Sequence, residues 1–437
     1  MTARRSSIAG LAFLVLLATG PLAGARLDPV AVAAQGLVPQ ELRTLAAQLF
    51  RELADLRGLP APGQAPAVVV RSRDERRRFI VRELTRKYPP ARLDAERRAM
   101  VAWGLVPIDF DLTGFLTDLV LEQAAAYYDP IGKTMVLANW LGPDAQRDAL
   151  THELVHALQD RQVDLDTFLV SPPGRSDETL ARQAVIEGEA VALSLDLTLS
   201  RQGQSLDRLA DVESYQRAID SSATGPVLSR APRFVRSMLT FPYAAGLGFV
   251  HELRRRSPWS QVRALYRDPP RSTAQILHPE LYFDRRQPPV VVPFPDLADA
   301  LGPGGQLVIE DDAGEFGLRE ILRQHLGDQA DAAGWRGDRY AVWNDQGALV
   351  LVALTLWDSE GTAGAFLQAY ARLLGRKLDL LLPTGERALS TWRKDDRAFA
   401  LERRGRAVLV VERIRPAILD GVRQRVWDHL VKSAVLY

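Results

Sequence analysis

The sequence contains no cysteine. This absence excludes disulfide bonds, thiolate metal sites, a thiol nucleophile and lipid attachment through cysteine. Any metal site must therefore be built from histidine and carboxylate side chains. Histidine is also scarce, since the 437 residues include only six.

Neither sign of charge is in excess, because 55 basic residues stand against 54 acidic ones. Nucleic-acid-binding proteins usually carry a basic excess on one face, so we expect no nucleic-acid partner. The Arg-rich segments 73–78 and 403–406 are interpreted as solvated helix and turn. A hydrophobic content of 47% and a charged content of 25% are ordinary for a globular protein. The chain can therefore bury a large core.

Long apolar runs are restricted to residues 8–17. This run follows Arg4–Arg5 and precedes the small residues Ala23–Ala25, which is the pattern of a secretory signal peptide. It is too short for an ordinary transmembrane helix. We expect residues 1–25 to be a signal peptide and the protein to be periplasmic or secreted, without stable membrane insertion after signal removal. Cleavage at Val32–Ala34 and an uncleaved anchor are the alternatives.

Residues His152–His156 spell H-E-x-x-H in a segment expected to be helical from about Gly142 to Gln162. Residues four apart lie on one face of a helix, so both imidazoles can reach one metal ion. Glu153 is turned toward the open side of that ion, where it can accept a proton from water. The neighbouring residues are mostly apolar, and burying His and Glu without a partner is costly. The motif therefore predicts a zinc site with Glu153 as general base.

A catalytic zinc site takes three protein ligands and leaves a position for water. Glu187 and Glu189 are the candidates for the third ligand, on a long helix expected from Ser176 to about Leu199. Two residues along a helix correspond to a rotation of about 200°. Only one of these two carboxylates can therefore face the ion.

The H-E-x-x-H motif followed by a helical Glu resembles the pattern of the gluzincins, which are thermolysin-like and aminopeptidase-like zinc peptidases. Residues 152–160 and 187–190 also resemble poorly characterised exported bacterial proteins of this type. The aminopeptidase pattern favours Glu187 as ligand, whereas the thermolysin-like pattern favours Glu189. We expect His152, His156 and Glu187 to bind Zn²⁺. The resemblance is specific at these two motifs and covers roughly residues 120–285.

The resemblance implies a metallopeptidase that hydrolyses a peptide or protein substrate, with Glu153 moving the proton. A strand near residues 124–128 would pair with the extended substrate. An oxyanion donor is also required, and His278 is favoured for that role over the other candidates, Tyr243, His251 and Tyr282. Hydrolysis of a non-peptide amide is a weaker alternative.

The sequence also departs from the thermolysin-like pattern. Thermolysin-like proteins carry an Asp four residues after the ligand Glu, whereas Val191 and Leu193 stand at the corresponding positions here. Asp160 could orient a ligating imidazole instead. A second hypothesis is therefore a non-catalytic envelope or interaction protein on a zincin scaffold. The presence of Glu153 favours the enzyme, because a site that only binds metal needs no base.

The predicted fold class is α+β. Residues 26–286 are expected to form a zincin-like, mainly helical catalytic domain with a small edge sheet, and residues 287–437 a smaller α+β domain. The Gly- and aromatic-rich segment 334–340 is interpreted as a tight turn, with a site that contacts the cleft as the alternative. In the second domain the pattern predicts strands at 290–292, 306–309, 348–357, 397–402 and 407–412, and helices at 316–326 and 364–374.

Overall fold

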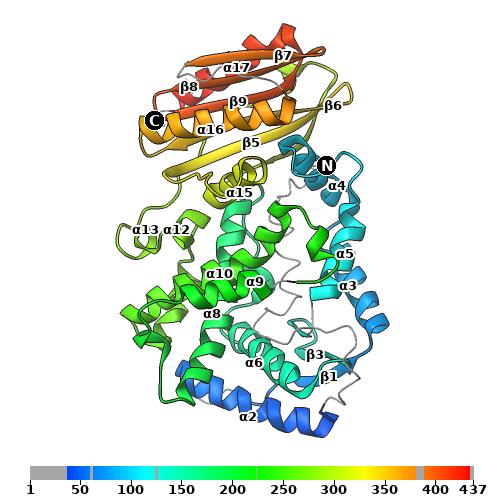
Figure 1. The fold of residues 1–437 in the computed structure, drawn as a ribbon, viewed down its shortest axis with the longest axis vertical. Helices are drawn as coiled ribbons and strands as arrows, with labels where there is room; N and C mark the ends of the chain where they lie inside the picture. Colours follow the sequence, from blue (N-terminus) through cyan, green and yellow to red (C-terminus); the bar gives the residue numbers. More distant parts are fainter. Residues whose placement is uncertain (1–36, 60–62, 124–125, 223, 380–387, 434–437) are drawn as a thin grey trace.

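The structure is a computed structural model that describes residues 37–59, 63–123, 126–222, 224–379 and 388–433 (Figure 1). The expected signal peptide lies outside the described residues. Within them, no helix combines the length and the apolar character needed to cross a membrane. The architecture is α+β as predicted: a largely helical part is followed by a six-stranded sheet.

The chain begins with helices that surround a small sheet. Apolar residues recur at helical spacing along helix α2 (Pro39–Arg57), which ends where Gly58 adopts a left-handed conformation with a φ of 71°. Its inward face buries leucines, including Leu42 and Leu49. Helix α5 (Leu112–Gln123) was not predicted from the sequence. The helices of this part are α2 (Pro39–Arg57), α3 (Arg73–Lys87), α4 (Pro90–Trp103) and α5 (Leu112–Gln123).

The small sheet has the strand order β1-β3-β2, in which β3 is parallel to β1 and antiparallel to β2. Strands β2 and β3 form a hairpin, and its turn is fixed by Asp129, whose Oδ1 accepts from the backbone N–H groups of Ile131 and Gly132. Strand β2 lies at one edge of the sheet. The strands are β1 (Ala67–Arg71), β2 (Ala126–Asp129) and β3 (Thr134–Ala138).

Three long helices form the centre of the helical part (Figure 1). Helix α6 starts at Pro143, as the Gly-Pro-Asp sequence predicts, and packs on α8. Helices α8 and α10 cross so closely that a Cβ atom on Gly188 would overlap the backbone of Gly246. The helices of this region are α6 (Pro143–Asp160), α7 (Leu165–Phe168), α8 (Ser176–Ser200), α9 (Glu213–Ser222), α10 (Arg233–Arg256), α11 (Arg263–Arg267), α12 (Thr273–Leu277) and α13 (Pro279–Phe283).

The second part is an antiparallel sheet of order β4-β5-β6-β9-β8-β7 with helices on both faces. Residues alternate between the faces, as on β6, where Leu351 joins the core shared with the helical part and Val352 joins a separate core under α17. The elements are α14 (Ala298–Leu301), β4 (Gly305–Asp311), α15 (Gly314–Leu326), β5 (Trp335–Asp345), β6 (Ala348–Trp357), α16 (Glu360–Leu378), β7 (Leu389–Lys394), β8 (Arg397–Arg404), β9 (Ala407–Ile414) and α17 (Leu419–Lys432).

Two predictions for this part were wrong. Segment 334–340 is not a tight turn, because Trp335 begins the long strand β5 and the ladder is irregular only between Trp335 and Gly337. Segment 290–292 is not a strand, although the backbone N–H of Val290 donates to the carbonyl of Arg336 at 2.7 Å. Apolar strand-like residues at that position therefore dock beside β5 without joining the ladder.

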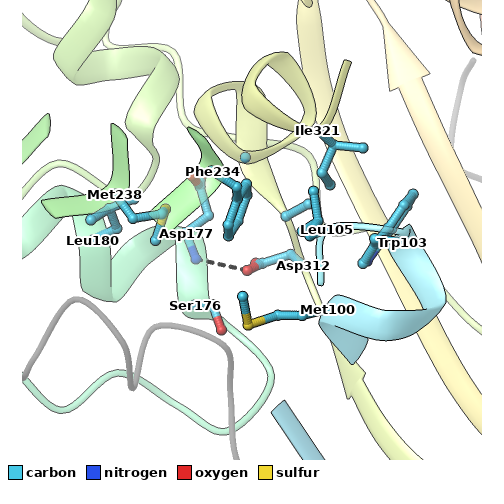
Figure 2. Close-up of a pocket in the computed structure, with 12 residues that line it drawn as sticks. Met100, Trp103, Leu105, Ser176, Asp177, Leu180, Phe234, Met238, Asp312 and Ile321 are labelled. Carbon is cyan, nitrogen blue, oxygen red and sulfur yellow. Dashed lines mark hydrogen bonds between the residues drawn. The ribbon is translucent and has the colours of Figure 1, made fainter. Parts of the chain in front are cut away.

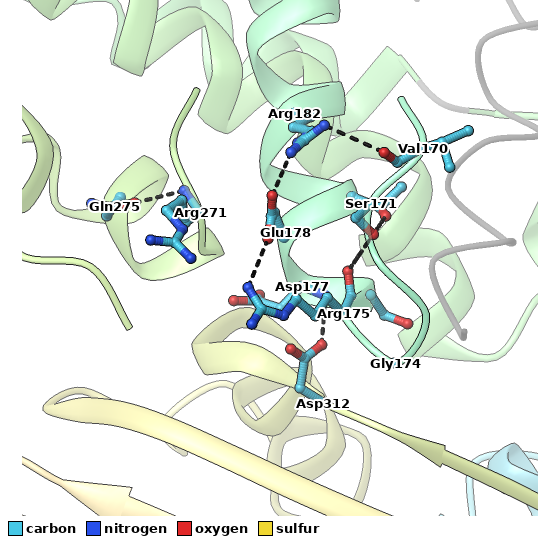
Figure 3. Close-up of polar contacts among 12 residues, drawn as sticks. Val170, Ser171, Gly174, Arg175, Asp177, Glu178, Arg182, Arg271, Gln275 and Asp312 are labelled. Atoms are coloured by element: carbon cyan, nitrogen blue, oxygen red, sulfur yellow. Dashed lines mark hydrogen bonds and ion pairs between the residues drawn. The ribbon is translucent and has the colours of Figure 1, made fainter. Parts of the chain in front are cut away.

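The two parts share a continuous core. Trp103 of α4 packs edge-on against Tyr340 of β5 and Tyr370 of α16. The N-terminus of α8 also meets the second part, where the backbone N–H of Asp177 donates to Asp312 at 2.8 Å (Figures 2 and 3). Met100 and Phe234 line the small apolar pocket next to this contact (Figure 2). The helix that carries Glu187 is thus anchored on the six-stranded sheet.

Candidate metal centre

Three of the predicted ligands come together between α6 and α8. The Nε2 atoms of His152 and His156 lie 3.2 Å apart, and Oε2 of Glu187 lies 3.2 Å from the first and 3.5 Å from the second. All three side chains are buried. They form a group that could hold a metal ion.

The spacing of these atoms fits a tetrahedral ion. Metal–nitrogen and metal–oxygen bonds of about 2.0–2.2 Å at tetrahedral angles place ligand atoms roughly 3.3–3.5 Å apart. A single proton can bridge only one pair among the two imidazole nitrogens and the carboxylate oxygen, whereas one cation satisfies all three. The donor set of two imidazoles and one carboxylate is also one that zinc accepts in catalytic sites.

The charges of the group support the same reading. Burial opposes protonation of His156, but the adjacent carboxylate of Glu187 outweighs it and raises the pKa of His156 to about 9. Burial likewise raises the pKa of Glu187, yet the imidazoles, His156 first, hold it below its ordinary value. The metal-free protein therefore keeps a proton in this pocket at neutral pH. A metal ion that binds there must displace that proton.

The orientation of His156 is fixed from behind by Gln159. Nδ1 of His156 lies 2.8 Å from Oε1 of Gln159, whose amide nitrogen donates to the carbonyl of Ile186 and to Glu189. Because Oε1 of Gln159 can only accept, Nδ1 carries a proton, so Nε2 is the nitrogen that faces the group and would bind a metal once its own proton is displaced. The prediction that Asp160 orients an imidazole is wrong, since its carboxylate accepts from the hydroxyl of Tyr128 and from Lys133.

The two alternatives for the third ligand are separated by the structure. Glu189 is not part of the ligand group and pairs with the guanidinium of Arg57 at 2.5 Å, where both side chains are buried. It also accepts a hydrogen bond from Tyr266. Glu187 is the carboxylate that meets His152 and His156, as expected.

Glu153 is buried on α6 beside the group. Its Oε2 accepts the backbone N–H of Tyr128 on β2 at 2.7 Å. Burial raises the pKa of Glu153, and the nearby imidazoles of His156 and His152 partly offset that effect. A carboxylate whose pKa lies above its ordinary value is better suited to accept and return a proton.

The four residues considered as oxyanion donors make different contacts in the structure. His278, the favoured one, is ion-paired with Glu315 of α15 at 2.7 Å and is not part of the His152–His156–Glu187 group. His251 contacts the carbonyl of Leu209 at 3.2 Å, and Tyr282 donates to the carbonyl of Asp268. Tyr243 is the one at the site: its ring packs against His152, with centroids 6.0 Å apart, and its hydroxyl interacts with Glu187.

Sequence reasoning missed two arginines near the site. Arg57, at the end of α2, holds Glu189, and Arg76 lies in the segment 73–78 that was interpreted as solvated. The side chain of Arg76 is instead 0% exposed, so that interpretation is wrong at this position. The one available signal was helical spacing, because Arg76 is four residues before the buried Ile80.

Comparison with protein families gave one match. Residues 306–423, which are 118 of the 437 residues, match the family model of a domain of unknown function (DUF8575). This segment runs from β4 into α17 and contains none of the residues of the metal centre. Comparisons with curated proteins and with solved structures gave no match.

Proposed function

We propose that this protein is a zinc-dependent metallopeptidase, with His152, His156 and Glu187 as zinc ligands and Glu153 as general base. The observation that carries the proposal is the convergence of three buried ligand atoms, at mutual distances of 3.2–3.5 Å, from an H-E-x-x-H helix and its neighbour. A zincin-like catalytic part followed by a C-terminal α+β part is included in this proposal.

In this proposal, different residues around the group carry out different steps of peptide hydrolysis. A zinc ion bound there would act as a Lewis acid toward water and toward the peptide carbonyl. Glu153 accepts one proton from the attacking water, whose oxygen adds to the carbonyl carbon. It then returns that proton to the leaving nitrogen as the carbon–nitrogen bond breaks, so that water is fully divided between the two products. Tyr243, whose hydroxyl interacts with Glu187, would turn that hydroxyl to donate to the developing oxyanion.

The edge strand β2 supports the proposal, because the backbone of an extended substrate could pair with it. Strand β2 is at the edge of the small sheet, and its residue Tyr128 holds Glu153 through the backbone. Edge strands present free backbone groups on which an extended peptide can align by strand addition. A peptide added there would lie next to the general base.

Metal analysis and a peptidase assay of wild type, Glu153→Gln and His156→Ala test the proposal. We expect about one zinc per chain in wild type and in Glu153→Gln, and loss of zinc from His156→Ala. Activity on a broad peptide panel should fall by about 10²–10⁴-fold in Glu153→Gln. Absence of zinc from the wild type would refute the proposal. Zinc in both proteins without any hydrolysis would favour the non-catalytic zincin scaffold.

A further inference from the structure

Arg76 of α3 is a buried cation that the proposed reaction does not yet use. Its side chain is 0% exposed, whereas Arg73 and Arg77 on the same helix are exposed. Its guanidinium lies over the ring of Trp140, 5.1 Å from the centroid. A charged side chain is rarely buried to this extent unless it is paired.

Apart from the Trp140 ring, the described part of the chain offers this guanidinium no hydrogen-bond or ion-pair partner. All three guanidinium nitrogens of Arg76 are buried without a hydrogen-bond partner there. The buried Arg57 provides the contrast, because it pairs with Glu189 and donates to the carbonyl of Trp259. Burial lowers the pKa of Arg76 only to about 10, so the group remains charged at neutral pH. A buried charge of this kind is costly unless something neutralises it.

The surroundings of Arg76 place it at the candidate active site. Phe79, three residues after Arg76 on α3, stacks on the ring of Tyr127 in β2 with centroids 4.5 Å apart, and the carboxylate of Glu153 acts on the charge of Arg76. Tyr127 precedes the residue whose backbone N–H holds Glu153. Arg76 and the general base therefore face the same region next to the edge strand β2.

A free guanidinium presents a planar fork of N–H donors that matches a carboxylate in a bidentate geometry. We propose that Arg76 binds a carboxylate of the substrate next to the scissile bond, and this inference rests on the proposed peptidase function. The carboxylate has two sources, the free C-terminus of a short peptide or an Asp or Glu side chain. The first source predicts a carboxypeptidase-like action, and the second a preference for acidic residues.

Peptidase assays with substrate variants and with two Arg→Gln replacements test this role. Each cleaved peptide is compared with its C-terminal amide and with versions in which Gln or Asn replaces the acidic residues. Arg76→Gln should lower kcat/KM by about 30-fold or more for the peptide that carries the required carboxylate and should abolish the preference for it. The matched control is Arg73→Gln, which removes an exposed arginine over the same Trp140 ring and should leave both values unchanged. Equal loss on all peptides would overturn the inference.

Stability separates ligand binding from a structural role. Arg76→Gln removes a buried charge for which the described residues offer no hydrogen-bond or ion-pair partner, so the Tm of the metal-free protein should stay the same or rise. A structural arginine would instead lower the Tm when replaced. A marked fall in Tm would therefore overturn the inference.

Binding tests the role without any turnover. The zinc-loaded Glu153→Gln protein is titrated by calorimetry with N-acetyl-alanyl-alanine, its amide, and N-acetyl-alanyl-glutamate amide. We expect binding of one of the two carboxylate probes but not of the amide, and loss of that binding in the double variant with Arg76→Gln. This outcome would support the site even if the wild type hydrolysed no peptide. Hydrolysis by the wild type with no carboxylate-dependent binding would overturn the Arg76 inference and leave the peptidase proposal standing.

Discussion

Two carboxylates on α8, separated by one residue, have different roles because a helix turns about 200° between them. Glu187 faces the imidazoles, and Glu189 faces the permanent charge of Arg57. The partner of Glu187 can lose its charge by releasing a proton, whereas Arg57 cannot. The same chemical change at the two positions should therefore have different consequences.

We expect Glu189→Gln to lower the free energy of unfolding of the metal-free protein by about 3–5 kcal/mol, because it leaves Arg57 buried without its counter-charge. Glu187→Gln should cost far less, since His156 then becomes neutral, but it should abolish high-affinity zinc binding. Urea denaturation with a chelator present measures the first effect, and metal titration measures the second. Loss of zinc affinity in Glu189→Gln with full affinity in Glu187→Gln would reverse the ligand assignment.

Which residues of the site could be predicted depends on how local their contacts are. His152, Glu153 and His156 follow from spacing on one helix, and the third ligand came from the motif on the next. The partners that fix them were not predictable, because they come from distant segments: Tyr128 of β2 holds Glu153, and Arg57 of α2 holds Glu189. The Arg-rich composition of segment 73–78 also led to a wrong prediction, because this segment contains both exposed arginines and the fully buried Arg76.

Helix packing explains the glycine inside the second motif. Gly188 lies where α8 crosses α10, and a Cβ atom there would meet the backbone of Gly246, which cannot rotate away. The two helices can approach only because both positions lack a side chain. The crossing sets the position of the turn of α8 that carries Glu187.

We therefore expect Gly188→Ala to destabilise the protein by about 1–3 kcal/mol and to weaken zinc binding, since the helices must separate. The matched control is Gly421→Ala in α17, where an added Cβ atom meets nothing within 4 Å. That change should stabilise the protein by up to about 1 kcal/mol through helix propensity. Thermal denaturation with and without zinc measures both variants. An unchanged Tm in Gly188→Ala would contradict the role of the crossing.

At the level of elements, the sequence predicts helices better than strands. The bounds of α2 follow from its apolar period and the terminating Gly58, and α6 begins at its Gly-Pro sequence. Strand β5 was missed because Gly334 and Gly337 are typical of turns. Gly337 is instead required where the carbonyl of Val290 approaches β5 so closely that a Cβ atom would overlap it. Such a contact with a distant segment leaves no periodic signal in the sequence.

The two parts of the molecule are joined through a cluster of buried carboxyl groups at the N-terminus of α8 (Figure 3). Asp177 accepts hydrogen bonds from the backbone and hydroxyl of Thr273, and Asp312 accepts from the backbone of Asp177. Burial first, and then the neighbouring charges of Asp338 and Glu315, raise the pKa of Asp177 to about 8. Burial and the adjacent acids raise the pKa of Asp312 as well.

These shifts make the junction sensitive to pH. The folded protein keeps on Asp177 a proton that the unfolded chain releases at about pH 4. The corresponding stability is therefore present below about pH 4 and is lost as the pH rises to about 8, with a slope of at most about 1.4 kcal/mol per pH unit for one proton.

Asp177→Asn keeps an acceptor for Thr273 but cannot ionise, so this part of the slope should disappear. Urea denaturation of the metal-free proteins between pH 5 and 8.5 measures it. His156 contributes its own loss above about pH 6.5 to both proteins, so the difference between the two curves isolates Asp177. Parallel curves would show that Asp177 is ionised in the folded state and that the hydrogen bonds of Thr273 and the α8 N-terminus are enough to hold its charge between the two parts.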